Sequence, residues 1–294
     1  MAAEKRKKLH GVEGIDIVLL LLFIAYALLI IIPFYNVLVC SFTSLKEYLT
    51  TPLLLFPKQP TLKNYQDLFA NGAIWIGYRT SFTILVLGVP LNLFLTTSMA
   101  YALSRRDTPG RKGIFSIILF TMLFNGGIIP LYLVIKQFGL VNSIFSVVLT
   151  YGINTFYMII MMNYFSTLPD SLMESARLDG AGEWRILLRI VLPLSAPIIA
   201  TITLFYAVDR WNEWYHSMIF IRKADITPLQ IVLRNIVLEA QNVDIQAGMD
   251  MDEIQQSPMG LKMCAVMVTM LPVMCIFPFL QKHFVKGVLV GAIK

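Results

Sequence analysis

The chain has 294 residues, of which 57% are hydrophobic and only 14% are charged. Soluble domains carry roughly a quarter charged residues. The composition therefore excludes an ordinary soluble protein, and the length leaves no room for a separate soluble catalytic domain. Basic loops that are retained on the inner side of a membrane account for the net charge of +6, so the charge does not require a nucleic-acid partner.

Six blocks of apolar residues are long enough to cross a bilayer, which takes about 20 residues. The first block follows Lys5-Arg6-Lys7-Lys8 and lacks a small-residue cleavage site at its end. We therefore expect a retained transmembrane helix there, not a signal peptide. The predicted spans cover residues 15–40, 80–104, 114–136, 144–165, 193–216 and 262–281. The predicted fold is all-α, a polytopic membrane protein with six transmembrane helices.

The distribution of Lys and Arg predicts the orientation of these spans. With the N-terminus inside, the cytoplasmic segments hold more than half of the chain's 24 basic residues. These segments are the N-terminal segment 1–14, the short loop 105–113, the loop 166–192 and the C-terminal tail 282–294. The outer segments are 41–79 and 217–261, and the six-helix transmembrane domain covers 15–281. Both termini are thus expected in the cytoplasm.

Two spans contain helix-breaking residues. Pro90 interrupts the second span, and the third contains Asn125-Gly126-Gly127 followed by Pro130. Broken backbone at membrane depth is tolerated only where protein or a water-filled cavity satisfies the freed groups. The third span is either a broken helix that lines a pathway, or it has a packing kink or a short re-entrant turn. The polar loop 217–261 is long enough to make a structured contact outside the membrane.

The cytoplasmic loop 166–192 predicts a helix, a tight turn and a second helix. Ser171 and Glu174 have the spacing of a capping box at the start of the first helix. Gly180 and Gly182 suit the turn, because glycine adopts conformations that strain other residues. The second helix is expected to be amphipathic. Its apolar face carries Trp184, Leu187, Leu188 and Val191, and another face carries Arg185 and Arg189.

This two-helix element suits docking to another protein. Ala176 and Gly180 are small residues that allow close approach, and Glu174 and Asp179 offer carboxylates for a partner's arginine. The alternative is that Glu174 only caps its own helix and the second helix lies in the membrane interface.

Three short stretches of the loop carry a family resemblance. They are Glu174-Ser175-Ala176, Asp179-Gly180-Ala181 and Ile190-Val191-Leu192-Pro193. Together they resemble the EAA loop of binding-protein-dependent ABC importer permeases, which implies a type I ABC importer transmembrane domain. The family pattern has alanine where Ser175 stands, and its I-x-L-P sequence follows the glycine by nine residues, whereas Ile190 follows Gly180 by ten. The resemblance implies that the loop is a coupling helix seated in an ATP-binding subunit. The implied coupling residues are Glu174, Ser175, Ala176, Leu178, Asp179, Gly180 and Ala181.

The resemblance extends along most of the chain and is closest to the smaller permease subunit of maltose-type sugar importers, in the polysaccharide-permease branch. Further stretches that carry it are Asn125-Gly126-Gly127, Leu140-Val141-Asn142, Leu204 to Val208 with Trp211-Asn212, and the tail from Lys286 to Lys294. It implies a second permease subunit, two ATP-binding subunits that hold ATP and Mg, and an extracytoplasmic sugar-binding protein, all at a bacterial inner membrane. It also implies that the tail reaches between the ATPase subunits. Oligosaccharides or polysaccharide fragments are the implied cargo, with alginate and aldouronates among the candidates.

The chain itself is not expected to be an enzyme. It has no phosphate-cradling G-x-x-x-x-G-K-[ST] sequence. The cysteines Cys40, Cys264 and Cys275 have no CxxC spacing, so neither a disulfide framework nor a metal site is expected. No cofactor is expected on this chain. The rival interpretation is a self-sufficient secondary transporter or channel, which predicts ion-coupling carboxylates inside the spans and an inverted repeat.

Candidate pathway or binding-protein contacts are fewer. Polar and aromatic residues crowd the outer end of the fifth span, and ionisable groups at a span edge suggest function. The candidates are Asn125, Asp209, Trp211 and Asn212. The alternative is an aromatic belt with interfacial charges, which we favour for Trp214 and Tyr215.

Overall fold

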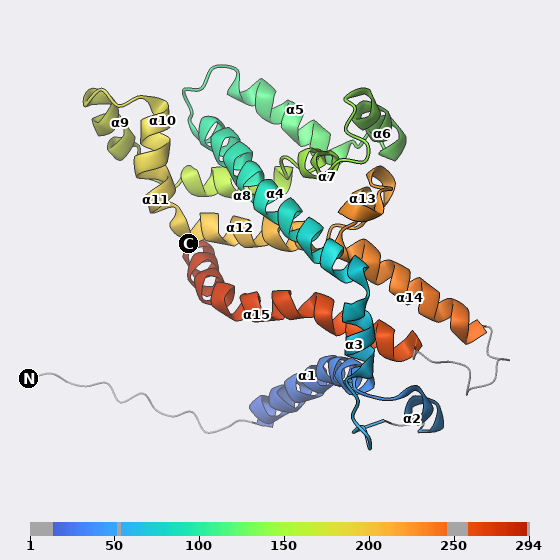
Figure 1. The fold of residues 1–294 in the computed structure, drawn as a ribbon. Coiled ribbons are helices and arrows are strands. Elements are labelled where there is room, and N and C mark those ends of the chain that lie inside the picture. The colour runs from blue at the N-terminus through green and yellow to red at the C-terminus, as the bar shows by residue number, and fades with distance from the viewer. Residues whose placement is uncertain (1–13, 52–53, 246–257, 293–294) are drawn as a thin grey trace, which may run out of the picture. The chain divides into compact units, whose positions relative to one another are not determined.

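The computed structural model describes residues 14–51, 54–245 and 258–292, and all regular secondary structure within them is helical (Figure 1). The chain divides into two units. The first comprises residues up to 68 together with 239–267, and the second comprises 69–238 together with 268–294. The predicted N-terminal segment 1–14 lies almost entirely outside the described residues, as does part of the outer loop 217–261.

The first unit contains α1 (Gly14–Ser41), α2 (Leu45–Thr50), most of α3 (Lys63–Ala70) and the adjoining ends of α14 (Leu229–Ile245) and α15 (Pro258–Ala292). The amide of Asn64 fixes the end of α1 by donating to the carbonyls of Ser41 (3.1 Å) and Thr43 (2.9 Å). Gly260 of α15 lies so close that a Cβ there would meet the Asn64 side chain at 2.5 Å. Most of α1 exposes apolar side chains, as expected for a surface that faces lipid or another protein.

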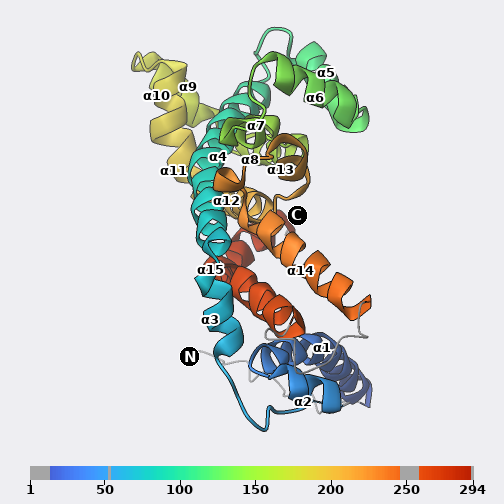
Figure 2. The same cartoon turned by 45° about the vertical axis from the view of Figure 1, so that its right-hand side comes forward.

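The second unit is organised around α4 (Gly72–Ser104), which packs most extensively against α8 (Thr155–Phe165) and α12 (Ala196–Trp211) (Figure 2). Ala100, Met158, Met161, Phe165 and Ile202 are completely buried in this core. The core holds α4, α8 and α12 together and therefore positions everything attached to their ends.

The predicted spans have counterparts among the described helices. Ile15–Ser41, Gly72–Ser104 and Pro258–Ile276 are each long and apolar enough to cross a membrane. Three further candidates are pairs of helices with a sharp bend. They are α5 (Arg111–Leu123) with α6 (Ile128–Gln137), α7 (Ile144–Thr150) with α8, and Glu183–Leu194 with α12. Counting each pair as one span gives the six that the sequence predicts.

The second span differs from its prediction at two points. It begins at Gly72, eight residues before the predicted start, because the Asn71 side chain accepts a 3.0 Å hydrogen bond from the backbone N–H of Ala73 and so caps the helix there. The helix also passes through Pro90 without ending. The predicted interruption at Pro90 is therefore wrong.

The helix of the third predicted span is interrupted, which fits both a broken span and a re-entrant turn. Its halves α5 and α6 meet at 114°. Asn125 accepts a 2.9 Å hydrogen bond from the backbone N–H of Gly127, whose φ of 86° is a conformation that suits glycine. Asn125 therefore stabilises the turn between the two halves.

The fourth span is also bent, which the sequence analysis did not predict, since α7 and α8 meet at 49°. A bend of 88° near Ser195 separates Glu183–Leu194, which lies almost entirely in the cytoplasmic loop, from α12, close to the predicted start of the fifth span at residue 193. Pro197 in the first turn of α12 cannot donate a backbone hydrogen bond to the preceding helix, so the helix breaks there. The span ends at Trp211, five residues before the predicted end. A short helix α13 (Tyr215–Phe220) follows, and the Glu213 carboxylate caps its start by accepting from the backbone N–H of His216 at 2.7 Å.

The last predicted span and the described part of the predicted tail, residues 282–292, belong to one helix. α15 continues from Pro258 to Ala292, so no break in secondary structure separates residue 281 from 282.

Candidate functional site

The cytoplasmic loop contains the predicted helix, turn and helix. α9 (Asp170–Leu178) ends in a turn, and α10 (Glu183–Ile186) continues through a π-helical segment, η1 (Leu187–Val191), into α11 (Leu192–Leu194). Gly180 has a φ of 77°. Its N–H donates to the carbonyl of Arg177, and the N–H of Ala181 donates to the carbonyl of Ala176, each at 2.9 Å. This is a Schellman ending, which requires the left-handed conformation that glycine adopts most readily.

The predicted capping box at the start of α9 is wrong. The helix begins at Asp170, after Pro169 in the capping position, so Ser171 already lies inside the first turn and no side chain caps the helix. Proline fixes the backbone for a helix start and determines this boundary. Glu174 is exposed and makes no hydrogen bond or ion pair with any residue in the described part of the chain. The interpretation that Glu174 only caps its own helix is therefore excluded.

Apolar side chains attach the loop to the core of the second unit. Met173, Ile186, Leu187 and Val191 are buried there. The predicted apolar face is only half right, since Trp184 and Leu188 are each 58% exposed. The π-helical segment at Leu187–Val191 has more residues per turn than an α-helix, so residues at α-helical spacing no longer share one face.

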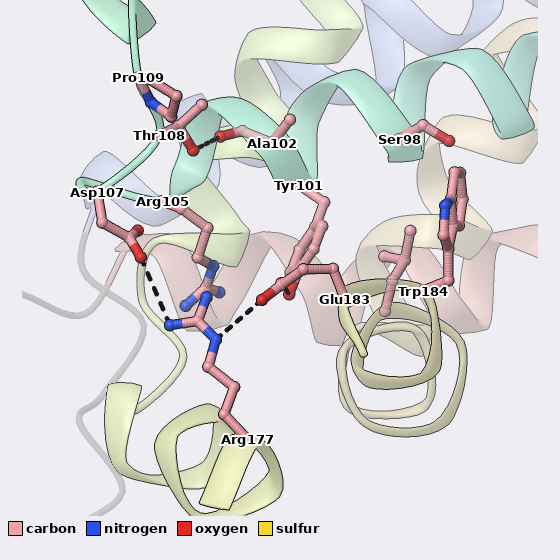
Figure 3. A pocket seen from close by; sticks show the side chains of 11 residues that line it. Ser98, Tyr101, Ala102, Arg105, Asp107, Thr108, Pro109, Arg177, Glu183 and Trp184 are labelled. Carbon is pink, nitrogen blue, oxygen red and sulfur yellow. Dashed lines mark hydrogen bonds and ion pairs between the residues drawn. The ribbon is translucent and has the colours of Figure 1, made fainter. Parts of the chain in front are cut away.

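Glu183 at the start of α10 is the polar link between the loop and α4 (Figure 3). Its two carboxylate oxygens accept hydrogen bonds from the hydroxyl of Tyr101 (2.5 Å) and from Nε of Arg177 (2.9 Å). Arg177 also pairs with Asp107 at 3.5 Å. The bond to Glu183 raises the pKa of the Arg177 guanidinium, which stays charged. The network joins α4, the basic loop 105–113 and both helices of the cytoplasmic loop.

A second ion pair joins the basic loop 105–113 to the start of α9. The largely buried Arg105 donates to Asp170 at 3.2 Å, and its guanidinium lies 5.2 Å from the centre of the Tyr101 ring. The cytoplasmic loop is thus held at both of its helices, by buried apolar side chains and by charged contacts to α4 and the residues after it.

The outer surface of α9 and its turn is free for contact. The exposed residues of the predicted coupling set are Glu174, Ser175, Leu178, Asp179 and Gly180, and the half-buried ones are Ala176 and Ala181. Leu178 is 89% exposed, which is unusual for a large apolar side chain in an ordered helix. The geometry is that of a fixed support with an exposed carboxylate and an exposed leucine at its end.

Arg210 near the end of α12 organises a second region, in a role that the sequence analysis did not assign to it. It is 3% exposed, and its guanidinium donates to the carbonyls of Val147 (2.8 Å), Val148 (2.8 Å) and Tyr151 (2.9 Å). These carbonyls belong to the last turn of α7 and the break that follows, where helix geometry leaves acceptors free. A basic residue in an apolar span was the available signal.

Asn92 of α4 provides further hydrogen bonds to the backbone carbonyls at this break. Its amide nitrogen donates to the carbonyls of Tyr151 and Gly152, and its oxygen accepts from Nε of Arg210 at 3.0 Å. Gly88 provides the space, since a Cβ there would lie 2.8 Å from Nε of Arg210. The fourth span is therefore broken at a place where neighbouring helices satisfy its backbone.

A hollow of about 370 Å³ lies beside this break. It is lined by Tyr151, Asn154, Tyr206, Asp209, Arg210, Asn212, Glu213, Trp214 and Tyr215. Two of the four predicted pathway residues, Asp209 and Asn212, line it. Trp211 does not line this hollow, because its side chain is buried and donates to the carbonyl of Thr269 at 3.3 Å.

Asn125 lies in the turn between α5 and α6 and is not among the lining residues. In the described part of the chain, no three His, Cys, Asp or Glu side chains are grouped as metal ligands would be.

Comparison with known proteins gives a consistent assignment. The family described as "Binding-protein-dependent transport system inner membrane component" matches residues 80–290. The chain is 39% identical over 275 residues to the polygalacturonan/rhamnogalacturonan transport system permease protein YtcP of Bacillus subtilis (strain 168), covering 92% of this chain and 94% of the relative. It is 38% identical over 264 residues to Protein LplC of the same organism, covering 90% and 89%.

A crystal structure of a bacterial ABC transporter involved in the import of the acidic polysaccharide alginate contains a similar chain. The TM-score is 0.83 at 29% sequence identity, and the match covers 92% of this chain and 96% of that one. These similarities confirm the resemblance stated from the EAA loop and disfavour a self-sufficient secondary transporter or channel. The chain belongs to the family of inner-membrane permease components of binding-protein-dependent ABC transport systems.

Proposed function

We propose that this chain is one permease subunit of an ATP-driven sugar importer and that it works as a heterodimer with a second permease. Two ATP-binding subunits dock on its cytoplasmic side and hold the ATP and Mg, and an extracytoplasmic sugar-binding protein delivers the cargo. The family assignment supports this, because its members are components of binding-protein-dependent systems. ATP hydrolysis is a property of the partner subunits in this proposal.

The observation that carries the proposal is the construction of the cytoplasmic loop. The exposed Glu174 and Leu178 project from an element whose other side is fixed to α4 by Met173 and by the Tyr101–Glu183–Arg177 network. An element that is only a membrane-interface helix does not need an exposed carboxylate on a rigid support. A force applied at the end of α9 is transmitted to α4, which packs on α8 and α12. ATP-driven closure of the ATPase pair would therefore move the spans and alternate their access.

The proposed orientation follows from the basic loops. Residues 105–113 and 166–192 face the cytoplasm together with both termini, and the tail 282–294 reaches between the ATPase subunits. The outer segment 217–261, which includes the whole of α14, contacts the sugar-binding protein. Deleting part of this segment should abolish stimulation of ATPase activity by that protein; stimulation that persists in an assembled complex would contradict the contact.

The proposed cargo is an oligosaccharide or a polysaccharide fragment. The names of the relatives support the class, since one is a polygalacturonan/rhamnogalacturonan permease and the similar crystal structure belongs to an alginate importer. Several more distant relatives are named for arabinooligosaccharides and for melibiose, raffinose and stachyose.

Reconstitution tests the proposal against a self-sufficient transporter. The chain should be assembled in proteoliposomes alone, and also with its partner permease, the ATP-binding subunits and the binding protein. Only the full complex should take up oligosaccharide, and only with ATP inside. Uptake by this chain alone, driven by an ion gradient, would contradict the proposal.

A further inference from the structure

The hollow beside the break in the fourth span has the size and position of a small-molecule site. At about 370 Å³ it lies within the roughly 300–1,000 Å³ range of ligand pockets. It sits where the α7–α8 break adjoins the end of α12, and a broken helix at membrane depth is tolerated where it lines a cavity. Lining residues come from the α7–α8 connection, from α12 and from the residues that follow α12.

Apart from Arg210, the polar groups that line the hollow include carboxylates, hydroxyls and asparagine amides. Asp209 is exposed, and one of its carboxylate oxygens accepts a 2.9 Å hydrogen bond from the hydroxyl of Tyr157, which leaves the other oxygen available. Asn212 is exposed as well. Glu213 adds a second carboxylate to the lining, although it is largely buried and caps α13.

The cation in the lining, Arg210, is buried and bonded mainly to the protein's own groups, which leaves it little capacity to bind an anionic ligand. It is 3% exposed, and its four hydrogen bonds to Asn92 and to the three carbonyls near the end of α7 occupy four of the five donors that a guanidinium has. No other lining residue is basic. A carboxylate that entered the hollow would meet the charge of Asp209 without a free cation to compensate it.

Two aromatic rings complete the lining. Trp214 and Tyr215 are 44% and 43% exposed, and their rings meet edge to face at 5.8 Å. Exposed aromatic rings with neighbouring hydrogen-bonding groups offer an apolar surface with a polar edge. This combination suits a pyranose ring, which has an apolar C–H face and hydroxyl groups around its rim.

We propose that this hollow binds uncharged, hydroxyl-bearing sugar units of the cargo through Asp209 and the Trp214–Tyr215 pair, and that it discriminates against uronate carboxylates. The inference rests on the proposed function and refines its substrate class. A neutral oligosaccharide fits this subunit, even though the named cargo of some relatives is acidic.

The test uses two trisaccharides that differ only at C6. Galactotriose carries a hydroxymethyl group where trigalacturonate carries a carboxylate. Their dissociation constants should be measured by ligand-observed NMR on the assembled complex in nanodiscs, without the binding protein. We expect galactotriose to bind about tenfold more tightly, the effect of one like charge several ångströms away at a partly hydrated site. Asp209→Asn should bring the ratio of the two constants towards one.

Two control variants separate charge from structure. Asp67→Asn removes a carboxylate on α3, outside the hollow, and should leave the ratio unchanged. Tyr157→Phe removes the hydrogen bond to Asp209 but keeps its charge, and should also leave the ratio unchanged.

Three results would overturn the inference: trigalacturonate binding as tightly as galactotriose, an unchanged ratio in Asp209→Asn, or no binding of either sugar. Failure of the proposed function would appear elsewhere, as the absence of ATP-driven uptake by the full complex.

Discussion

Arg210 of α12 donates a 3.0 Å hydrogen bond to the side-chain oxygen of Asn92 in α4, and both side chains also bond to the carbonyl of Tyr151 in the break between α7 and α8. Three helices are therefore joined at one buried point. The guanidinium of Arg210 donates to backbone carbonyls of the broken span, and truncating this side chain would leave several buried carbonyls without donors.

Arg210→Lys should destabilise the protein strongly. A lysine has one ammonium group and cannot reach the separate carbonyls that the guanidinium bridges. Each buried acceptor that is left unpaired costs about 1–3 kcal/mol. We expect a clear fall in the thermal unfolding temperature of the detergent-purified protein. The matched control is Arg222→Lys, an exposed position, which should change the temperature little. Equal stability of the two variants would contradict the role given to Arg210.

Gly88→Ala, beside Arg210, should lower the stability of the protein by less than Arg210→Lys does. The added Cβ would lie 2.8 Å from Nε of Arg210 and 3.2 Å from its Cδ, so the guanidinium must shift away from its acceptors. Overpacking of this kind typically costs about 1–3 kcal/mol. Gly113→Ala is the control, because a Cβ there meets nothing within 4 Å. The same unfolding assay applies, and a Gly88→Ala protein as stable as the control would show that the site has spare room.

Glu183→Gln should weaken transport without releasing the ATPase. The amide keeps the shape of the side chain but loses the charged acceptor for Arg177, so the support of α9 becomes looser. Charge-assisted hydrogen bonds are roughly twice as strong as neutral ones. We expect a several-fold fall in sugar uptake per ATP hydrolysed, with normal co-purification of the ATPase. Unchanged coupling would mean that the Tyr101–Glu183–Arg177 network does not transmit the movement.

Cysteine labelling should establish the orientation of the membrane domain. In a protein that lacks Cys40, Cys264 and Cys275, cysteines at Arg106 and Ser171 should react with a membrane-impermeant reagent only from the cytoplasmic side. Cysteines at Gln59 and Lys223 should react only from outside. All four positions are exposed. Labelling of Ser171→Cys from the outer side would contradict the proposed topology.

The sequence predicts the all-α class, six apolar segments and the helix–turn–helix of the loop, because each depends on local composition or on glycine and proline chemistry. The conformation of Gly180 and the helix break beside Gly127 were predictable for this reason. The bend in the fourth span was not, since it depends on partners distant in the chain. Asn92, 118 residues from Arg210, satisfies the break in the fourth span. The same distance hid the role of Arg210 from the sequence analysis, whereas Asp209 and Asn212, which line the hollow, were candidates because of their local setting.

Retention of the ATP-binding subunit tests the proposed coupling role of Glu174 most directly. If its carboxylate pairs with a basic group in a partly desolvated cleft, removing it strands a charge, which costs about 3–5 kcal/mol, whereas an exposed pair is worth about 0–1 kcal/mol. Gly180→Val should act similarly, because its φ of 77° strains a branched residue. Arg185→Ala, an exposed position on α10, is the milder control.

The measurement is the amount of ATPase that co-purifies with Glu174→Ala, together with sugar uptake, at equal membrane insertion. Glu174→Ala should insert normally, lose most of the bound ATPase and fail to transport. Normal ATPase retention and normal transport by Glu174→Ala would contradict the proposed coupling role.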